Sequence, residues 1–245
     1  MKKLLISLPA LAVLCCSSPA LAQSSKATAQ ITTVTVCANS NNLAPCVAQG
    51  SQTIPTGVWH NVMTTSIKTS NIADLFVDTS LVTGLYTSTQ VKGNGSGSTS
   101  TSSAMGGVQV RAVMDPQFDG GGNVVGGTYA YPDKQGTGVT FDQRIQTLTA
   151  NLGYIFTDCF ASGGNTGTGC LLTQEQITLA LDTTSAHSFN FILLNVGAGT
   201  HTLLIQAQVN TSATGSNGGV AISNAMFGLG SVTVESVRLV NSFSF

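Results

Sequence analysis

Residues 187–209 read HSFNFILLNVGAGTHTLLIQAQV and hold the most regular strand pattern of the chain. In the first half, apolar side chains occupy both faces, with Phe191 on one and Ile192 on the other, which is typical of a strand covered on both sides. Residues 197–199 then break the pattern. From 201 to 209, apolar residues alternate with Thr and Gln, as in a strand with one buried face. The two segments predict a β-hairpin and make the fold all-β.

The alternating pattern recurs along the chain, whereas helical periodicity is scarce. A helical turn is an alternative only at 72–76 and at 173–176. Segments rich in Gly, Ser and Asn predict exposed loops at 93–107, 120–127 and 211–219. We expect the remaining strands at 27–36, 58–67, 73–77, 81–90, 108–114, 139–150 and 177–181, and from 231 onward with a bulge near Glu235.

The N-terminus has the three parts of a secretion signal. Lys2 and Lys3 precede an apolar stretch at 4–16, and small residues at 20–22 predict cleavage before Gln23. We therefore expect a signal peptide at 1–22 and a single β-sandwich domain at 23–245. The protein would be secreted, extracellular or at the cell surface, with the periplasm as the alternative. No later segment reaches the about 18 apolar residues that a membrane-spanning helix needs, so we expect no transmembrane helix.

Four cysteines beyond the signal form two pairs, and each pair flanks a short polar segment. Eight residues separate Cys37 from Cys46, and ten separate Cys159 from Cys170. Of the three possible connectivities, local pairing is the most economical because each loop is short and flexible. A zinc site would favour gaps of about two to four residues within a ligand pair. The spacing therefore predicts two structural disulfides and an oxidising compartment.

The chain carries little charge. Charged residues make up 8% of the sequence, whereas about 25% is usual in globular domains. The lysines and arginines are scattered and form no basic patch, so nucleic-acid binding is disfavoured. A surface of hydroxyl and amide groups suits a protein that packs into an assembly or functions outside the cell.

The candidate chemical groups favour a structural interpretation. His60, His187 and His201 lie on expected strands, where single histidines usually have structural partners, although a Ser-His-Asp arrangement remains open because it is defined by geometry. Asp115, Asp119 and Asn123 could offer oxygens to calcium, but their spacing differs from that of an EF-hand and favours a turn. We therefore expect no catalytic, metal or cofactor-binding residue.

Residues 189–209, together with 108–115 (VQVRAVMD), resemble the late hairpin and a mid-domain strand of tumour-necrosis-factor-like jelly rolls. The resemblance implies a single jelly-roll-like antiparallel β-sandwich. It also implies a protein that binds or assembles and does not catalyse. The expected function is therefore a secreted, non-catalytic structural, adhesive or surface-assembly role.

We expect a homo-oligomer or surface assembly in which residues 26–36, directly after the signal, contribute a strand edge. A closed trimer and an open filament both fit this expectation.

Two other functions stay open. A carbohydrate-binding module would use exposed aromatic side chains to bind a glycan, and the chain offers Trp59, Tyr86, Tyr129, Tyr131 and Tyr154. A small outer-membrane β-barrel would explain the alternating apolar residues that end at Phe245, although regular lipid-facing strands are mostly missing.

Overall fold

The computed structural model describes residues 27–40, 52–93, 98–157 and 171–239. These residues form strands and turns and contain no helix, which confirms the predicted all-β class. The strands are β1 (Ala27–Asn39), β2 (Gln52–Thr53), β3 (His60–Thr69), β4 (Ala73–Lys92), β5 (Ser100–Phe118), β6 (Val124–Tyr129), β7 (Val139–Ala150), β8 (Tyr154–Thr157), β9 (Leu171–Gln174), β10 (Gln176–Val196), β11 (Gly199–Ser216) and β12 (Val220–Val237).

Two sheets face each other as a sandwich. Sheet A has the order β10-β4-β12-β1-β2, and sheet B has the order β3-β11-β5-β6 with β7 also paired to β5. All pairs in the two sheets are antiparallel except β1–β2. Numbered along the chain, the eight long strands are ordered 6-3-8-1 in sheet A and 2-7-4-5 in sheet B, which is the order of a jelly roll. The predicted jelly-roll-like sandwich is therefore confirmed.

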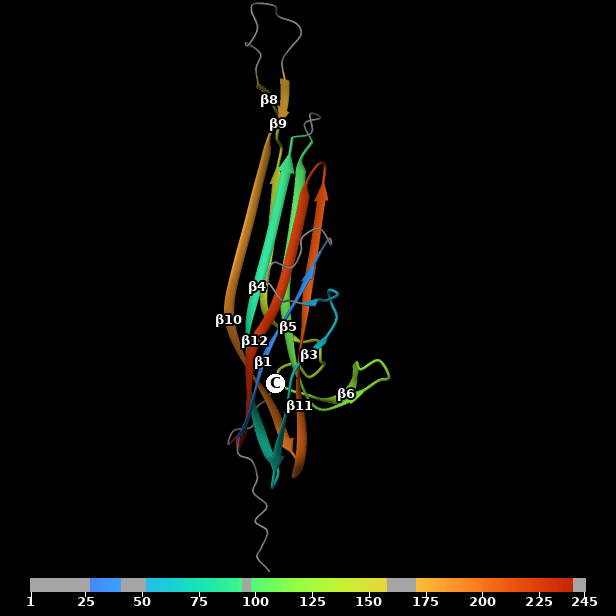
Figure 1. Ribbon diagram of the computed structural model, residues 1–245, viewed down its shortest axis with the longest axis vertical. Coiled ribbons are helices and arrows are strands. Elements are labelled where there is room, and N and C mark those ends of the chain that lie inside the picture. The colour runs from blue at the N-terminus through green and yellow to red at the C-terminus, as the bar shows by residue number, and fades with distance from the viewer. Residues whose placement is uncertain (1–26, 41–51, 94–97, 158–170, 240–245) are drawn as a thin grey trace, which may run out of the picture.

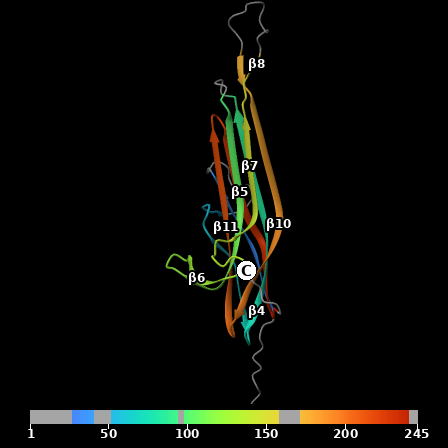
Figure 2. The ribbon, with the colours of Figure 1, turned by 180° about the vertical axis from the view of Figure 1, so that it is seen from behind.

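The sandwich is elongated because its strands are long. β4, β5, β10, β11 and β12 have 18 to 21 residues, whereas strands of about 3 to 10 residues are usual. They run along the long axis in both views, and the small β8–β9 ribbon lies at one end (Figure 1, Figure 2). A short strand, β6, projects from the side of sheet B.

The interior changes character along this axis, as β4 shows. Its first half buries mostly apolar residues, with Thr79 as the exception, whereas its second half buries three threonines beside Leu85 and Val91: the first set is Leu75, Val77 and Leu81, and the second is Thr83, Thr87 and Thr89. We call these two parts of the sandwich interior the apolar half and the polar half. The apolar half also holds the following buried residues of the other strands: Met63, Ile67, Phe191, Leu193, Leu203, Ile205, Val232 and Val234.

The predicted hairpin at 187–209 is wrong. β10 pairs with β4 in sheet A, and β11 pairs with β3 and β5 in sheet B. The short break at 197–199 therefore carries the chain from one sheet to the other. Phe191 on one face of β10 packs in the core, and the backbone of the next residue, Ile192, is bridged to Tyr131.

Several predicted boundaries also change. The strands at 27–36 and 139–150 are confirmed, and the strand expected at 58–67 is shifted by two residues to β3. The segments 73–77 and 81–90 merge into β4, and 177–181 merges with the following strand into β10. The segment 100–107 lies in β5 and not in a loop, because Ser100, Ser102 and Ala104 are buried in the sandwich. β11 likewise extends to Ser216.

The remaining local predictions are corrected in a similar way. The bulge of the last strand lies between Gly228 and Ser231 and not near Glu235. Segments 72–76 and 173–176, where a helical turn was the alternative, contain strand residues and no helix. The turn within 120–127 is confirmed at 120–122, although β6 begins at Val124.

The N-terminal and cysteine predictions fall largely outside the described residues. The signal at 1–22, Cys46, Cys159 and Cys170 all lie there. Cys37 is disulfide-bonded, but its partner is not described, so both pairings stay predictions. The described part of the chain contains no helix long and apolar enough to cross a membrane.

Candidate functional site

The N-terminal strand β1 has one paired edge and one largely open edge. Residues 27–39 pair antiparallel with β12, apart from a bulge between Thr32 and Thr35. On its other side, β1 pairs with β2 only at Val36 and Cys37. No described strand covers this second edge from 27 to 35. The strand predicted for self-association therefore belongs to its own sheet, and within the described residues its second edge is not paired from 27 to 35.

The open edge has little protection against pairing. Residues 27–36 include neither charge nor proline, and both are common devices that keep edge strands from associating. The bulge is the one such device that β1 has. Ile31 is 71% exposed and Val34 is 55% exposed. An uncharged edge that also displays apolar side chains is suited to contact with another protein surface.

The opposite edge of sheet A, formed by β10, is partly capped. Tyr131 exchanges two backbone hydrogen bonds with Ile192, at 2.8 and 3.1 Å. The Gln146 side chain donates to the Leu179 carbonyl at 2.7 Å. The two edges of the sheet therefore differ, because β10 is capped at Ile192 and Leu179 but also exposes Ile177 and Leu181.

A buried arginine organises the aromatic residues on the outer face of sheet B. The Arg111 guanidinium lies 4.2 Å from the ring centroid of Trp59 and 5.3 Å from that of Tyr129. Its Nε donates to Gln206 Oε1 at 2.9 Å, and its Nη1 donates to the Gly136 carbonyl at 2.6 Å. Burial lowers the pKa of Arg111, and this effect is opposed by Tyr129 and Asp133.

This arrangement affects the aromatic residues that were candidates for sugar stacking. Trp59 and Tyr129 each hold the Arg111 cation against a ring face, and Lys134 Nζ lies 4.1 Å from the Tyr131 centroid. One face of each of these rings is therefore occupied by a cation, Arg111 for Trp59 and Tyr129 and Lys134 for Tyr131, which makes them poor stacking platforms. The side chain of Tyr154 is not described, which leaves Tyr86, on the outer face of sheet A.

The structure brings Ser185, His187 and Asp142 together, but not as a catalytic triad. Ser185 Oγ lies 2.7 Å from His187 Nε2, and Asp142 Oδ2 lies 3.4 Å from the same nitrogen. A triad places the serine and the acid on opposite ring nitrogens. The Thr83 hydroxyl also donates to Asp142 Oδ2 at 2.7 Å. The cluster therefore links β10, β7 and β4 across the side of the sandwich.

His201 and His60 lie on strands, as predicted. His201 Nδ1 is 2.8 Å from Asp115 Oδ2, and its Nε2 is 3.0 Å from the Gly197 carbonyl. The hydrogen bond with Asp115 raises the pKa of His201. This contact joins the end of β5 to the start of β11. His60 begins β3, and burial lowers its pKa.

The candidate calcium residues are not gathered into one site. Asp115 contacts His201, whereas Asp119 Oδ1 accepts from the backbone N–H groups of Gly121 at 2.9 Å and Asn123 at 2.8 Å. The Asn123 side chain donates to Asp119 Oδ2 at 3.0 Å, and this bond is the main cause of a lowered Asp119 pKa. The predicted turn is confirmed.

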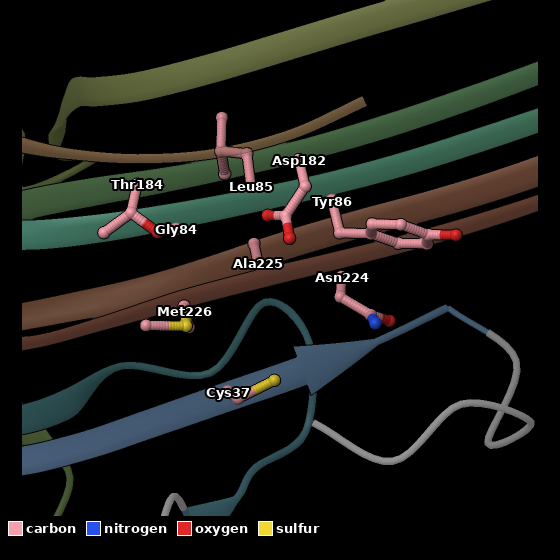
Figure 3. A pocket seen from close by; sticks show the side chains of 9 residues that line it. All are labelled: Cys37, Gly84, Leu85, Tyr86, Asp182, Thr184, Asn224, Ala225 and Met226. Atoms are coloured by element: carbon pink, nitrogen blue, oxygen red, sulfur yellow. The ribbon is translucent and has the colours of Figure 1, made fainter. Parts of the chain in front are cut away.

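A hollow lies on the outer face of sheet A, built from two adjacent cross-strand rows (Figure 3). One row sets Asp182 opposite Tyr86 and Tyr86 opposite Asn224. The next row contains Gly84 and Met226, which face each other. Because Gly84 has no side chain, Met226 lies over it, and a Cβ there would be 2.6 Å from Met226 Cγ. The hollow is shallow, with an enclosed volume of about 50 Å³.

Sequence reasoning singled out Tyr86 but missed most of the residues that these arrangements depend on. Arg111, Gln146 and Asn224 are polar residues within strands, and the alternating pattern assigns such residues to solvent. All three are buried. Their burial depends on which strands are neighbours, and the alternating pattern does not identify those neighbours.

Comparison with known proteins identifies no family. No family model matches the chain, and no curated protein is similar to it. Solved structures of infectious bursal disease virus align weakly. For the Gx strain, the TM-score is 0.16 at 11% identity over 94% of this chain and 44% of the other. For the Gt strain, the TM-score is 0.16 at 12% identity over 95% and 47%. The chain spans less than half of these proteins, and similarity at this level carries no argument about function.

Proposed function

We propose that the protein is a secreted, non-catalytic structural subunit that associates with a second copy of itself through the open edge of β1. The observation that carries this proposal is the uncharged edge from 27 to 35, which no described strand covers. Free N–H and C=O groups along such an edge can pair with another strand. The low overall charge, with a formal net charge of −1, leaves little repulsion between copies.

A second β1 is the partner that this edge suits best. Two copies related by a two-fold axis set β1 antiparallel to β1, and the same surface then serves both copies. Ile31 and Val34 of each copy would lose solvent exposure in this arrangement. Pairing of β1 with β10 of another copy would continue the sheet into a filament, but Tyr131 and Gln146 partly cap β10.

The test is the Ile31→Lys variant, measured by light scattering coupled to size-exclusion chromatography. We expect the wild-type protein to be a dimer and the variant a folded monomer, because a lysine on the edge brings two like charges together in the paired state. Ile72→Lys is the matched control, since Ile72 is 74% exposed and lies in the turn between β3 and β4. It should remain dimeric.

Two outcomes contradict the proposal. One is a wild-type protein that stays monomeric at its highest soluble concentration. The other is an oligomer that survives Ile31→Lys unchanged. Filaments visible by electron microscopy would instead indicate that β10 takes part and would reject the two-fold pairing.

A further inference from the structure

We draw no further inference here: the strongest candidate, the row of exposed apolar side chains that Ile177, Leu179 and Leu181 form on the edge strand β10, carries none because nothing in the described part of the chain shows what covers it.

Discussion

The apolar and polar halves of the sandwich interior are stabilised by different interactions. In the apolar half, Leu75 and Val77 of β4 lie in one hydrophobic cluster with Phe191 and Ile205. In the polar half, the same strand buries threonines. β4 alternates between inward and outward positions through both halves without interruption. A regular strand can therefore continue while the share of polar side chains in the core increases, although Leu85 and Val91 are also buried in its second half.

Gln146 of β7 is the centre of the polar half. The Thr87 hydroxyl donates to its Oε1 at 2.8 Å, and its Nε2 donates to Thr89 Oγ1 at 2.6 Å and to the Leu179 carbonyl at 2.7 Å. One side chain thus connects β7 of sheet B to both β4 and β10 of sheet A. Burial of polar groups is tolerated here because they satisfy one another.

The serines of the polar half make a second set of contacts. Ser102 Oγ donates to the Val220 carbonyl at 2.5 Å, and Ser223 Oγ donates to the Ser212 carbonyl at 3.0 Å. Both hydroxyls are buried and each reaches a backbone group on another strand. The apolar half is stabilised mainly by the burial of nonpolar surface. The stability of the polar half depends instead on the geometry of the hydrogen bonds between its buried polar groups.

The largest expected effect comes from a substitution that creates a cavity in the apolar half. Phe191→Ala should lower the free energy of unfolding by about 3 to 5 kcal/mol, because it removes a fully buried ring from the core. Urea unfolding measures the change. A decrease of less than about 1 kcal/mol in the free energy of unfolding would contradict the conclusion that the buried side chains of the apolar half stabilise the protein.

A smaller decrease in stability is expected when Gln146, the centre of the polar half, is replaced. Gln146→Leu should cost about 1 to 3 kcal/mol, because Thr87, Thr89 and the Leu179 carbonyl lose a partner while the buried volume stays similar. The double variant Gln146→Leu with Thr87→Val should recover part of this loss, since both partners of one hydrogen bond are then apolar. Strictly additive losses in urea unfolding would disprove the proposed coupling.

The smallest effect is electrostatic and lies at His201, beside the crossing from β10 to β11. Its pKa is raised in the folded protein, mainly by the hydrogen bond with Asp115. The stabilisation is therefore complete below the ordinary pKa and is lost as the pH rises through the higher folded value. Asp115 is half exposed, so solvent screening should keep the change below about 1 kcal/mol.

A pH series of urea unfolding curves measures this contribution. The His201→Gln variant should lack the pH-dependent loss, whereas Gln146→Leu should retain it, because the network around Gln146 contains only neutral groups. Stability that increases over the same pH range in the wild-type protein would contradict the expected sign.

Much of the strand content could be predicted from the sequence, and β7 was predicted with its observed bounds. The residues of the candidate sites were harder to predict from the sequence. The segment 100–107 reads as a loop because Ser and Gly rarely fill a core, yet it lies inside the polar half. Arg111 and Asn224 gave no signal, because polar residues in strands usually face solvent.

The sequence by itself determined the class of the fold and the direction in which most strand residues point, because alternation along a strand is a local property of the backbone. Only the tertiary structure decided which strands are neighbours. Residues on both sides of the 197–199 break enter different sheets, and no local pattern distinguishes a hairpin from such a crossing. The polar half depends on this choice as well, because Thr87 and Ser102 have their hydrogen-bond partners on strands far away in the chain.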